Sequence, residues 1–301
     1  DQPSQALRAD GSSVWIATPL GVARVPVSGE APWRHFTSQD GVPPGGVRSI
    51  AVDGKGGVCV GTQQGLARVM GETLEFVPLP GVDFPRVSSL WRAQDGTLWI
   101  GTPHGLLSLR ESWLTAYGSA QGLPNVAILA LREDRDGNLW VATERGLWRR
   151  NSTGFAAAPA ALGLAGEVIN GLFEAEDGSL WVGTQNEGVH RLSNGPMLPF
   201  GELEGSTLDW PTVVLETRDG TLWLGRVRGG LEQVRDGVVT RMGEAQGLDD
   251  DRVRSLARDN DGMLWVGTYS GVFRHDGQRF QRLGAQQGIP PGITVWAMVQ
   301  E

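Results

Sequence analysis

A short motif recurs seven times along the 301-residue chain, and its period constrains the fold more than any other feature of the sequence. The best copies read Asp-Gly, a variable residue, Leu-Trp, an aliphatic residue, Gly or Ala, and Thr, as at residues 95–102. The central motif position holds Trp15, Cys59, Trp99, Trp140, Trp181, Trp223 and Trp265. Successive copies lie 40 to 44 residues apart, a period that indicates a β-propeller or a solenoid.

Each repeat predicts four short β-strands joined by tight turns. In the third repeat, residues 87–91, 97–101, 106–109 and 113–117 are rich in apolar residues, and Asp-Gly or Gly turns separate them. No intervening segment has the length or the 3.6-residue period of a crossover helix. Four antiparallel strands form one blade, so the sequence predicts an all-β, seven-bladed β-propeller. The alternative is a β-solenoid, whose coils are usually shorter than about 30 residues.

The end of the chain predicts how the ring closes. Residues 288–299 match residues 41–52, which supply the first strand of the second repeat, whereas the first motif copy has only a poor strand at residues 5–7. We therefore expect residues 293–299 to complete the first blade beside residues 14–18, which removes an open sheet edge. Residues 1–301 would then form a single propeller domain. The competing interpretation is that the native chain continues into further blades.

Composition excludes several functions. The formal net charge of −8 argues against sequence-independent binding of nucleic acid or anionic lipid. Cys59 is the only cysteine, so no intrachain disulfide can form, and its motif position predicts a buried structural thiol. No apolar run approaches the length of a membrane span and no signal peptide is present, so we expect no membrane insertion within this chain. The start at Asp1 fits a mature protein or an excised domain.

The motif tryptophans are predicted to pack rather than to bind. Neighbouring blades cover both faces of a blade, so a large ring in the middle of a strand can wedge adjacent blades apart at the correct spacing. Stacking of these rings on carbohydrate is the alternative. Their regular placement in mid-strand favours the packing role.

The sequence contains no recognisable catalytic or metal-binding pattern. The four histidines, which fall in different blades, are His35, His104, His190 and His275. Residues 134–137 and 259–262 resemble calcium loops, but Arg145 and Ser270 stand where an EF-hand needs its last acidic ligand. There is no nucleophile elbow and no phosphate loop. We therefore predict no catalytic residue, no metal and no cofactor, although carboxylates from different blades could converge in the central channel for glycoside cleavage.

One face of the propeller is predicted to carry the binding residues. If the strands of a repeat are called A to D, their alternating direction brings the B–C turns and the D–A connections to the same face, and such loops commonly bind ligands. The candidate residues there are Arg226, Arg228, Arg252, Arg254, Arg145, Arg86, Arg48, His104 and Tyr269. The fork of donors on arginine suits carboxylate, sulfate or phosphate. In the alternative, these arginines form solvated ion pairs with Glu144, Glu167, Asp209 and residues 249–251.

Two further tryptophans lie outside the motif position. Trp210 and Trp296 each stand in or next to the start of a strand A. Either ring could face the central channel and stack on a ligand, or it could pack within its blade.

The complete repeat resembles the two-component regulator propeller family. The family unit runs a strand, Asp-x-x-Gly-x-Leu-Trp-Ile-Gly-Thr-x-x-Gly-Leu, another strand, and Gly-Leu-Pro. Residues 134–147 fit this unit, and residues 122–124 and 247–248 fit its end. The departures are Cys59 for Trp, Arg226 for Thr, and one extra residue before Gly188 and before Gly230.

This resemblance implies the extracytoplasmic or periplasmic sensor part of a bacterial signalling receptor. Such propellers usually precede a small β-sandwich, a membrane helix and a histidine kinase or diguanylate cyclase, none of which is visible in this sequence. The family carries no catalytic motif, and its ligands vary. Our first hypothesis is therefore a sensing module that binds a small, anionic or saccharide ligand and acts on attached signalling domains. The alternatives are a protein-interaction scaffold with a protein partner, and a lyase or hydrolase that uses channel residues.

Overall fold

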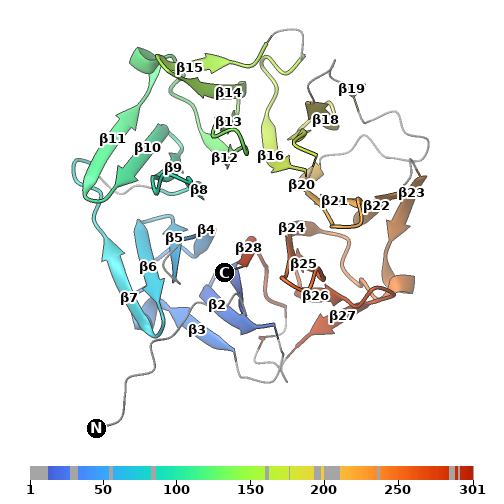
Figure 1. Cartoon of the computed structure of the whole chain (residues 1–301). Coiled ribbons are helices and arrows are strands. Elements are labelled where there is room, and N and C mark those ends of the chain that lie inside the picture. Colours follow the sequence, from blue (N-terminus) through green and yellow to red (C-terminus); the bar gives the residue numbers. More distant parts are fainter. Residues whose placement is uncertain are drawn as a thin grey trace.

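The chain forms a ring of seven blades around a common axis (Figure 1). The computed structural model describes residues 13–27, 33–53, 57–82, 86–159, 163–175, 177–192, 198–199, 211–235, 238–284, 289–290 and 292–300. Each blade is a four-stranded antiparallel sheet, and consecutive strands are neighbours within it. The predicted seven-bladed β-propeller is confirmed, and the solenoid alternative is wrong. The poor strand at residues 5–7 lies outside the described residues.

The strands fall into four concentric sets (Figure 1). The innermost strands are β4 (Val47–Val52), β8 (Ser89–Arg92), β12 (Ile128–Glu133), β16 (Ile169–Glu174), β20 (Pro211–Glu216), β24 (Val253–Arg258) and β28 (Ala297–Gln300). The second strands, which carry the motif, are β1 (Ser13–Thr18), β5 (Gly57–Thr62), β9 (Leu98–Thr102), β13 (Leu139–Thr143), β17 (Leu180–Thr184), β21 (Leu222–Arg226) and β25 (Leu264–Thr268).

The remaining two sets complete the outer part of each blade. The third strands are β2 (Gly21–Pro26), β6 (Leu66–Met70), β10 (Gly105–Arg110), β14 (Gly146–Asn151), β18 (Val189–Leu192), β22 (Leu231–Arg235) and β26 (Val272–His275). The outermost strands are β3 (Arg34–Thr37), β7 (Thr73–Val77), β11 (Trp113–Tyr117), β15 (Gly154–Ala157), β19 (Leu198–Pro199), β23 (Val238–Met242) and β27 (Phe280–Leu283). In the described part of the chain, short 3-10 helices follow three of the outermost strands, and these are η1 (Ser38–Asp40), η2 (Ser119–Gln121) and η5 (Glu244–Gln246).

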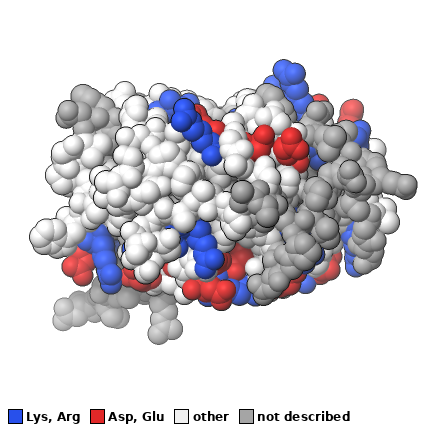
Figure 2. Space-filling model, turned by 90° about the horizontal axis from the view of Figure 1, so that it is seen from above, with Lys and Arg blue, Asp and Glu red and all other residues white. Residues whose placement is uncertain are grey.

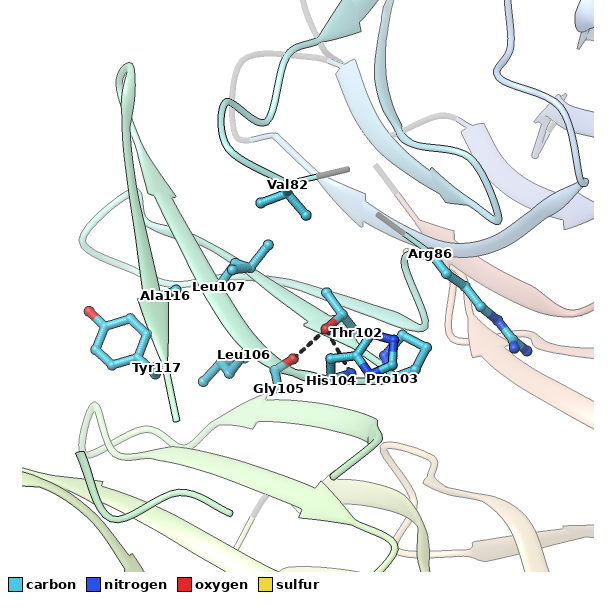
Figure 3. A pocket seen from close by; sticks show the side chains of 10 residues that line it. All are labelled: Val82, Arg86, Thr102, Pro103, His104, Gly105, Leu106, Leu107, Ala116 and Tyr117. Atoms are coloured by element: carbon cyan, nitrogen blue, oxygen red, sulfur yellow. Dashed lines mark hydrogen bonds between the residues drawn. The ribbon is translucent and has the colours of Figure 1, made fainter. Parts of the chain in front are cut away.

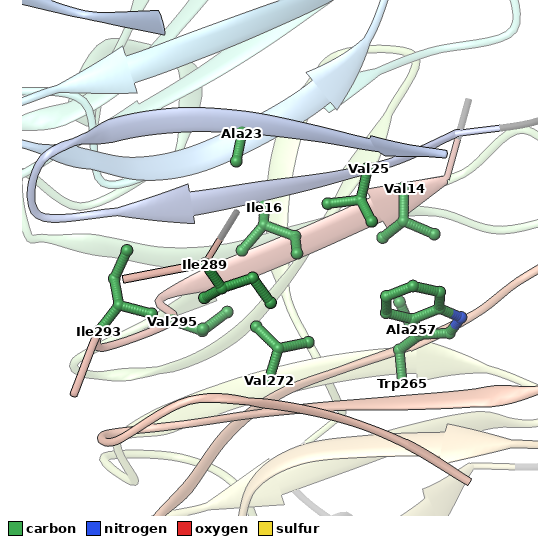
Figure 4. Close-up of a cluster of buried hydrophobic side chains, with 10 residues drawn as sticks. All are labelled: Val14, Ile16, Ala23, Val25, Ala257, Trp265, Val272, Ile289, Ile293 and Val295. Carbon is green, nitrogen blue, oxygen red and sulfur yellow. The ribbon is translucent and has the colours of Figure 1, made fainter. Parts of the chain in front are cut away.

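The last strand closes the ring as predicted. β28 pairs antiparallel with β1, so that Val299 lies opposite Trp15. Just before β28, Val295 is fully buried in an apolar cluster that joins the first and last blades (Figure 4). The sequence match between residues 288–299 and 41–52 is displaced by one residue, because Ala297 and not Trp296 occupies the place that Ser49 has in β4. Trp296 is therefore the structural counterpart of Arg48.

The motif tryptophans pack between blades, which confirms the packing interpretation. All six are at most 9% exposed, and Cys59 in the same position is also buried. Where the residue before the A–B turn is Asp, its carboxylate accepts the indole N–H. Trp140 Nε1 donates to Asp134 at 2.7 Å, and Trp265 Nε1 donates to Asp259 at 2.8 Å. These bonds satisfy the one polar group of the Trp140 and Trp265 rings.

A β-bulge near the start of the innermost strands determines which side chains lie near the axis. The register shifts by one residue near the start of β4, β12, β16, β20 and β24. A bulge turns its extra residue away from the normal alternation of a strand. The equivalent residues of the seven repeats are Trp296, Arg48, Ser88, Leu129, Asn170, Thr212 and Arg254. We call these seven equivalent positions, five of which lie at a bulge, the bulge level, and three of the seven residues were predicted site residues.

On the side of the outer wall that Figure 2 shows, the charged side chains of the described residues lie mostly toward the two edges of the ring. Figure 2 shows acidic and basic residues near both edges on one side of the molecule, with a band of uncharged residues between them. This distribution fits strands whose ends and turns meet solvent while their middles pack between blades.

Candidate functional site

Two of the predicted arginines are held by aromatic rings at the bulge level. Arg48 Cζ lies 4.5 Å from the centroid of the Trp296 ring, which belongs to the neighbouring blade. Arg254 Cζ lies 5.3 Å from the Tyr269 ring, and its Nη1 donates to Tyr269 Oη at 2.8 Å. The blades of Arg48 and Arg254 flank the blade that β28 completes (Figure 1). An aromatic face holds a guanidinium plane without using its N–H donors, so, apart from the Arg254 Nη1 that bonds Tyr269, the Nη donors of Arg48 and Arg254 remain available for a ligand.

Arg86 adds a third positive charge to this group. Burial lowers the pKa of Arg48, and the charges of Arg86 and Arg254 lower it further. Arg48 is therefore close enough to Arg86 and to Arg254, which belong to two other blades, to be repelled by both. Among the described residues, none of the three makes an ion pair with a carboxylate, and the buried Nε atoms of Arg48 and Arg254 have no hydrogen-bond partner. We call Arg48, Arg86, Arg254, Trp296 and Tyr269 the arginine cluster.

A pocket of about 490 Å³ adjoins the arginine cluster through Arg86 (Figure 3). Val82, Leu106 and Leu107 give it apolar walls, and Tyr117 and Arg86 lie at opposite ends. His104 is exposed in the turn after β9, and its backbone N–H donates to Thr102 Oγ1 at 3.1 Å. The pocket therefore combines apolar walls with an imidazole and a guanidinium on one side, a composition common in small-molecule sites.

Arg226 does not reach the arginine cluster. It replaces the threonine whose hydroxyl bonds the B–C turn in other blades, as Thr184 Oγ1 does to the Gly188 carbonyl at 3.0 Å. The Arg226 side chain turns into the blade, is 1% exposed, and donates from Nη2 to Glu232 Oε2 at 2.9 Å. Glu232 is itself fully buried. The structure therefore assigns Arg226 a structural ion pair, and the glutamate six residues later is the only sequence signal of it.

The other predicted residues have varied environments. Arg252 Cζ lies 5.1 Å from the Tyr269 ring, but its Nε forms an ion pair with Asp250 Oδ1 at 3.0 Å, as the ion-pair alternative proposed. Burial alone raises the pKa of Asp250, but hydrogen bonds from the Arg252 side chain and from Ser270 outweigh it and lower the pKa to about 2. Arg145 and Arg228 are exposed in the turns after β13 and β21. Neither is among the charges that shift the pKa of Arg48.

Trp210 lies outside the described residues, so its predicted place is untested. Within the described ranges, no three His, Cys, Asp or Glu side chains are arranged to hold a metal ion. The part of the chain that the structure describes also has no helix long and apolar enough to span a membrane.

Sequence reasoning missed the contact between Arg48 and Trp296. The two residues were both candidates, but the match between residues 288–299 and 41–52 was one residue out of register and did not align them. An alignment of the strand residues Val295 and Val47, both fully buried, would have revealed their equivalence.

Three segments of the chain match a known protein family. Residues 122–145, 163–186 and 247–270 match the profile described as two component regulator propeller. Each segment runs from the end of one repeat through the motif of the next. A search of the curated proteins finds no match.

Several solved structures share the fold. The extracellular domain of the BT4673 two component system from B. thetaiotaomicron superposes with a TM-score of 0.56 at 17% identity, over 94% of this chain and 50% of that chain. PorZ, a surface component of the type-IX secretion system of Porphyromonas gingivalis, gives a TM-score of 0.68 at 14% identity, over 96% of this chain and 53% of that one. Virginiamycin B lyase from Staphylococcus aureus gives a TM-score of 0.65 at 17% identity, over 79% of this chain and 83% of that one. This chain thus spans about half the length of the BT4673 domain, and at these identities the likeness shows the fold alone.

Proposed function

The chain carries the repeat of the two-component regulator propeller family, and on this premise we propose that it is the ligand-sensing part of an extracytoplasmic bacterial receptor. The ligand is a small anion, a carboxylate-bearing or sulfated molecule, bound by the arginine cluster. Binding without turnover is the expected activity, and attached signalling domains are the expected recipients of the signal.

The observation that carries this proposal is the uncompensated charge of the arginine cluster. Arg48 is repelled by the charges of both Arg86 and Arg254, and among the described residues none of the three forms an ion pair. Like charges this close destabilise the free protein, so an anion that binds all three gains from relief of repulsion as well as from charge-assisted hydrogen bonds. Because arginine stays ionised, proton loss cannot relieve the repulsion near neutral pH.

The adjoining pocket supports a ligand that is larger than a bare inorganic ion. Its volume of about 490 Å³ is in the range for small molecules, and Arg86 connects it to the cluster. A ligand that places its anionic group among the arginines would extend its uncharged part along Val82 and Leu107. Acidic monosaccharides and short organic acids have this combination of charge and size.

A ligand screen followed by calorimetry tests the proposal. Uronic acids, sulfated sugars and dicarboxylates are screened by thermal shift at fixed ionic strength, because ligands of the folded state raise its stability with the logarithm of excess ligand. For each hit, calorimetry compares the wild type with the Arg48→Gln/Arg254→Gln variant. We expect at least a tenfold weaker affinity, since each lost charge-assisted hydrogen bond is worth about 1.5–3 kcal/mol.

The matched control is Arg145→Gln/Arg228→Gln, which removes the same charge from exposed turns in other blades. Equal weakening by both double variants would mean that only net charge matters and would overturn the assigned site. Conversion of the ligand, detected by chromatography after incubation, would instead identify an enzyme.

A further inference from the structure

Arg132, unlike Arg48 and Arg254, lies between two aromatic rings, and its strand β12 lies across the ring axis from β28 (Figure 1). Arg132 of β12 has its Cζ 4.8 Å from the centroid of Trp91 in β8 and 5.6 Å from that of Phe173 in β16. These are three consecutive innermost strands (Figure 1). Each of the three residues pairs in register with the motif tryptophan of its own blade, so they lie at one level.

The polar edges of this arrangement have donors but no acceptors. The buried Arg132 Nε and the buried Trp91 Nε1 have no hydrogen-bond partner, and the described residues offer the Arg132 guanidinium no ion pair. Glu174 is the carboxylate whose charge acts on the pKa of Arg132, raising it by less than burial lowers it. Its Oε1, however, accepts from Arg135 Nε at 3.0 Å and from the Arg135 backbone N–H at 2.8 Å. A buried donor without an acceptor costs about 1–3 kcal/mol, so two such donors on neighbouring strands call for an explanation.

A purely structural role leaves these donors unexplained. Stacking between rings uses the two faces of the guanidinium plane, whereas its N–H bonds point outward along the edge. Four other blades have aliphatic residues at this level, and these are Ala51, Leu215, Ala257 and Val299. Blades can therefore pack here without any polar group. Arg132, Trp91 and Phe173 are all only partly buried, so solvent reaches this level of the ring.

We propose that Arg132 and Trp91 form a carboxylate-binding site, separate from the arginine cluster. The guanidinium, held flat by Trp91 and Phe173, presents a planar pair of N–H donors to the two oxygens of a carboxylate. The indole N–H of Trp91 belongs to the ring on which the guanidinium stacks, so its chemical shift should report a carboxylate bound there. A planar carboxylate matches this edge better than a tetrahedral anion, because the fork of donors lies in one plane.

Side-chain NMR tests the site directly. In ¹⁵N-labelled protein, the Arg132 Nε–H and Trp91 Nε1–H signals are assigned by their loss in Arg132→Lys and Trp91→Phe. Sodium acetate and sodium benzoate are then titrated at constant ionic strength, with sodium chloride and sodium sulfate as comparison salts. We expect both signals to shift together along one saturation curve with the carboxylates, and in Arg132→Lys the Trp91 signal should need at least tenfold more carboxylate.

Two outcomes of the titration would overturn the proposed carboxylate site. Fixed signals throughout the carboxylate titration would overturn the site, and so would equal shifts with chloride or sulfate. The same titration of Arg48→Gln/Arg254→Gln separates this site from the arginine cluster, since both signals should respond there as in the wild type. The Trp91 signal is assigned by Trp91→Phe alone, so its titration in the wild type still tests the site if Arg132→Lys fails to fold.

Discussion

The guanidinium of Arg48 lies over the indole ring of Trp296, with Cζ 4.5 Å from the ring centroid, although the two residues are almost the full chain apart. Trp296 immediately precedes the strand that closes the ring, and its backbone N–H donates to the Ala17 carbonyl at 2.9 Å. Ring closure therefore positions one wall of the arginine cluster. Substitutions that disturb closure should also disturb anion binding.

Gly46 offers a direct test of the packing around Trp296. Its φ is +73°, and a Cβ atom there would lie 2.9 Å from Trp296 Cζ3 and 2.8 Å from the Pro19 carbonyl oxygen. Gly46→Ala should lower the free energy of unfolding by about 2–4 kcal/mol, from left-handed strain and from displacement of Trp296. Gly137→Ala is the matched control, since its φ is +79° and nothing lies within 4 Å. Urea denaturation of both variants measures the difference, and equal losses would contradict the proposed contact.

Arg226 should matter for stability and not for binding. Arg226→Ala removes the closer partner of the fully buried Glu232 and leaves it the exposed Arg241, whose Nε lies 3.6 Å from Glu232 Oε1. Breaking a buried ion pair in this way costs about 3–5 kcal/mol. The double variant Arg226→Leu/Glu232→Leu removes both charges and should recover most of that loss. Denaturant unfolding measures the stabilities. A single variant as stable as the wild type would show that the ion pair has no structural role.

The sequence alone was enough to predict the ring, because closure depends on a repeat. Seven motif copies fix seven blades, and the apolar strand near the chain end has one open edge to join, beside β1. The burial of the motif tryptophans follows from the same periodicity, since a mid-strand position between two blades meets no solvent.

The direction of individual side chains could not be predicted in the same way. Arg226 stands in a threonine position, and only its contact with Glu232 shows that it turns inward. Arg48 and Arg254 lie at bulges, and a shift of one residue in strand register changes the side to which a side chain points. Spacing along the chain does not reveal such shifts. Repeat spacing therefore identified the arginines of the candidate site, but it also included Arg226, whose side chain belongs to the blade interior.

His190 should make stability fall in mildly acidic solution. Burial lowers the pKa of His190, more than the nearby Glu187 and Glu167 raise it, so the folded state resists the proton that the unfolded chain takes up near pH 6.5. Between that value and the lower folded pKa, the unfolded state binds more protons, so stability decreases as pH falls. The slope from one such group is at most about 1.4 kcal/mol per pH unit.

Urea denaturation at several values between about pH 7.5 and about pH 5 measures this slope. His190→Gln should flatten the curve while lowering stability at neutral pH. Asp250 does not interfere, because its pKa of about 2 places its contribution well below this range. An unchanged slope in the variant would assign the effect to other groups, such as His275, whose pKa is also lowered by burial.

Cys59 should be inert in the folded protein and should weaken folding only in alkaline solution. Burial, helped by the charge of Asp53, raises the pKa of the Cys59 thiol to about 11, whereas a free cysteine ionises near pH 8.5. At about pH 8 the folded thiol should react with a disulfide reagent at least about a hundredfold more slowly than the unfolded chain, because only the thiolate attacks. Since the folded pKa is the higher one, the stabilising contribution of the neutral thiol is complete below about pH 8.5 and is lost as pH rises toward 11. Cys59→Val removes this alkaline slope, so reaction kinetics and urea denaturation at several pH values check both parts. Rapid modification of the native protein at neutral pH would show that Cys59 is reached without unfolding.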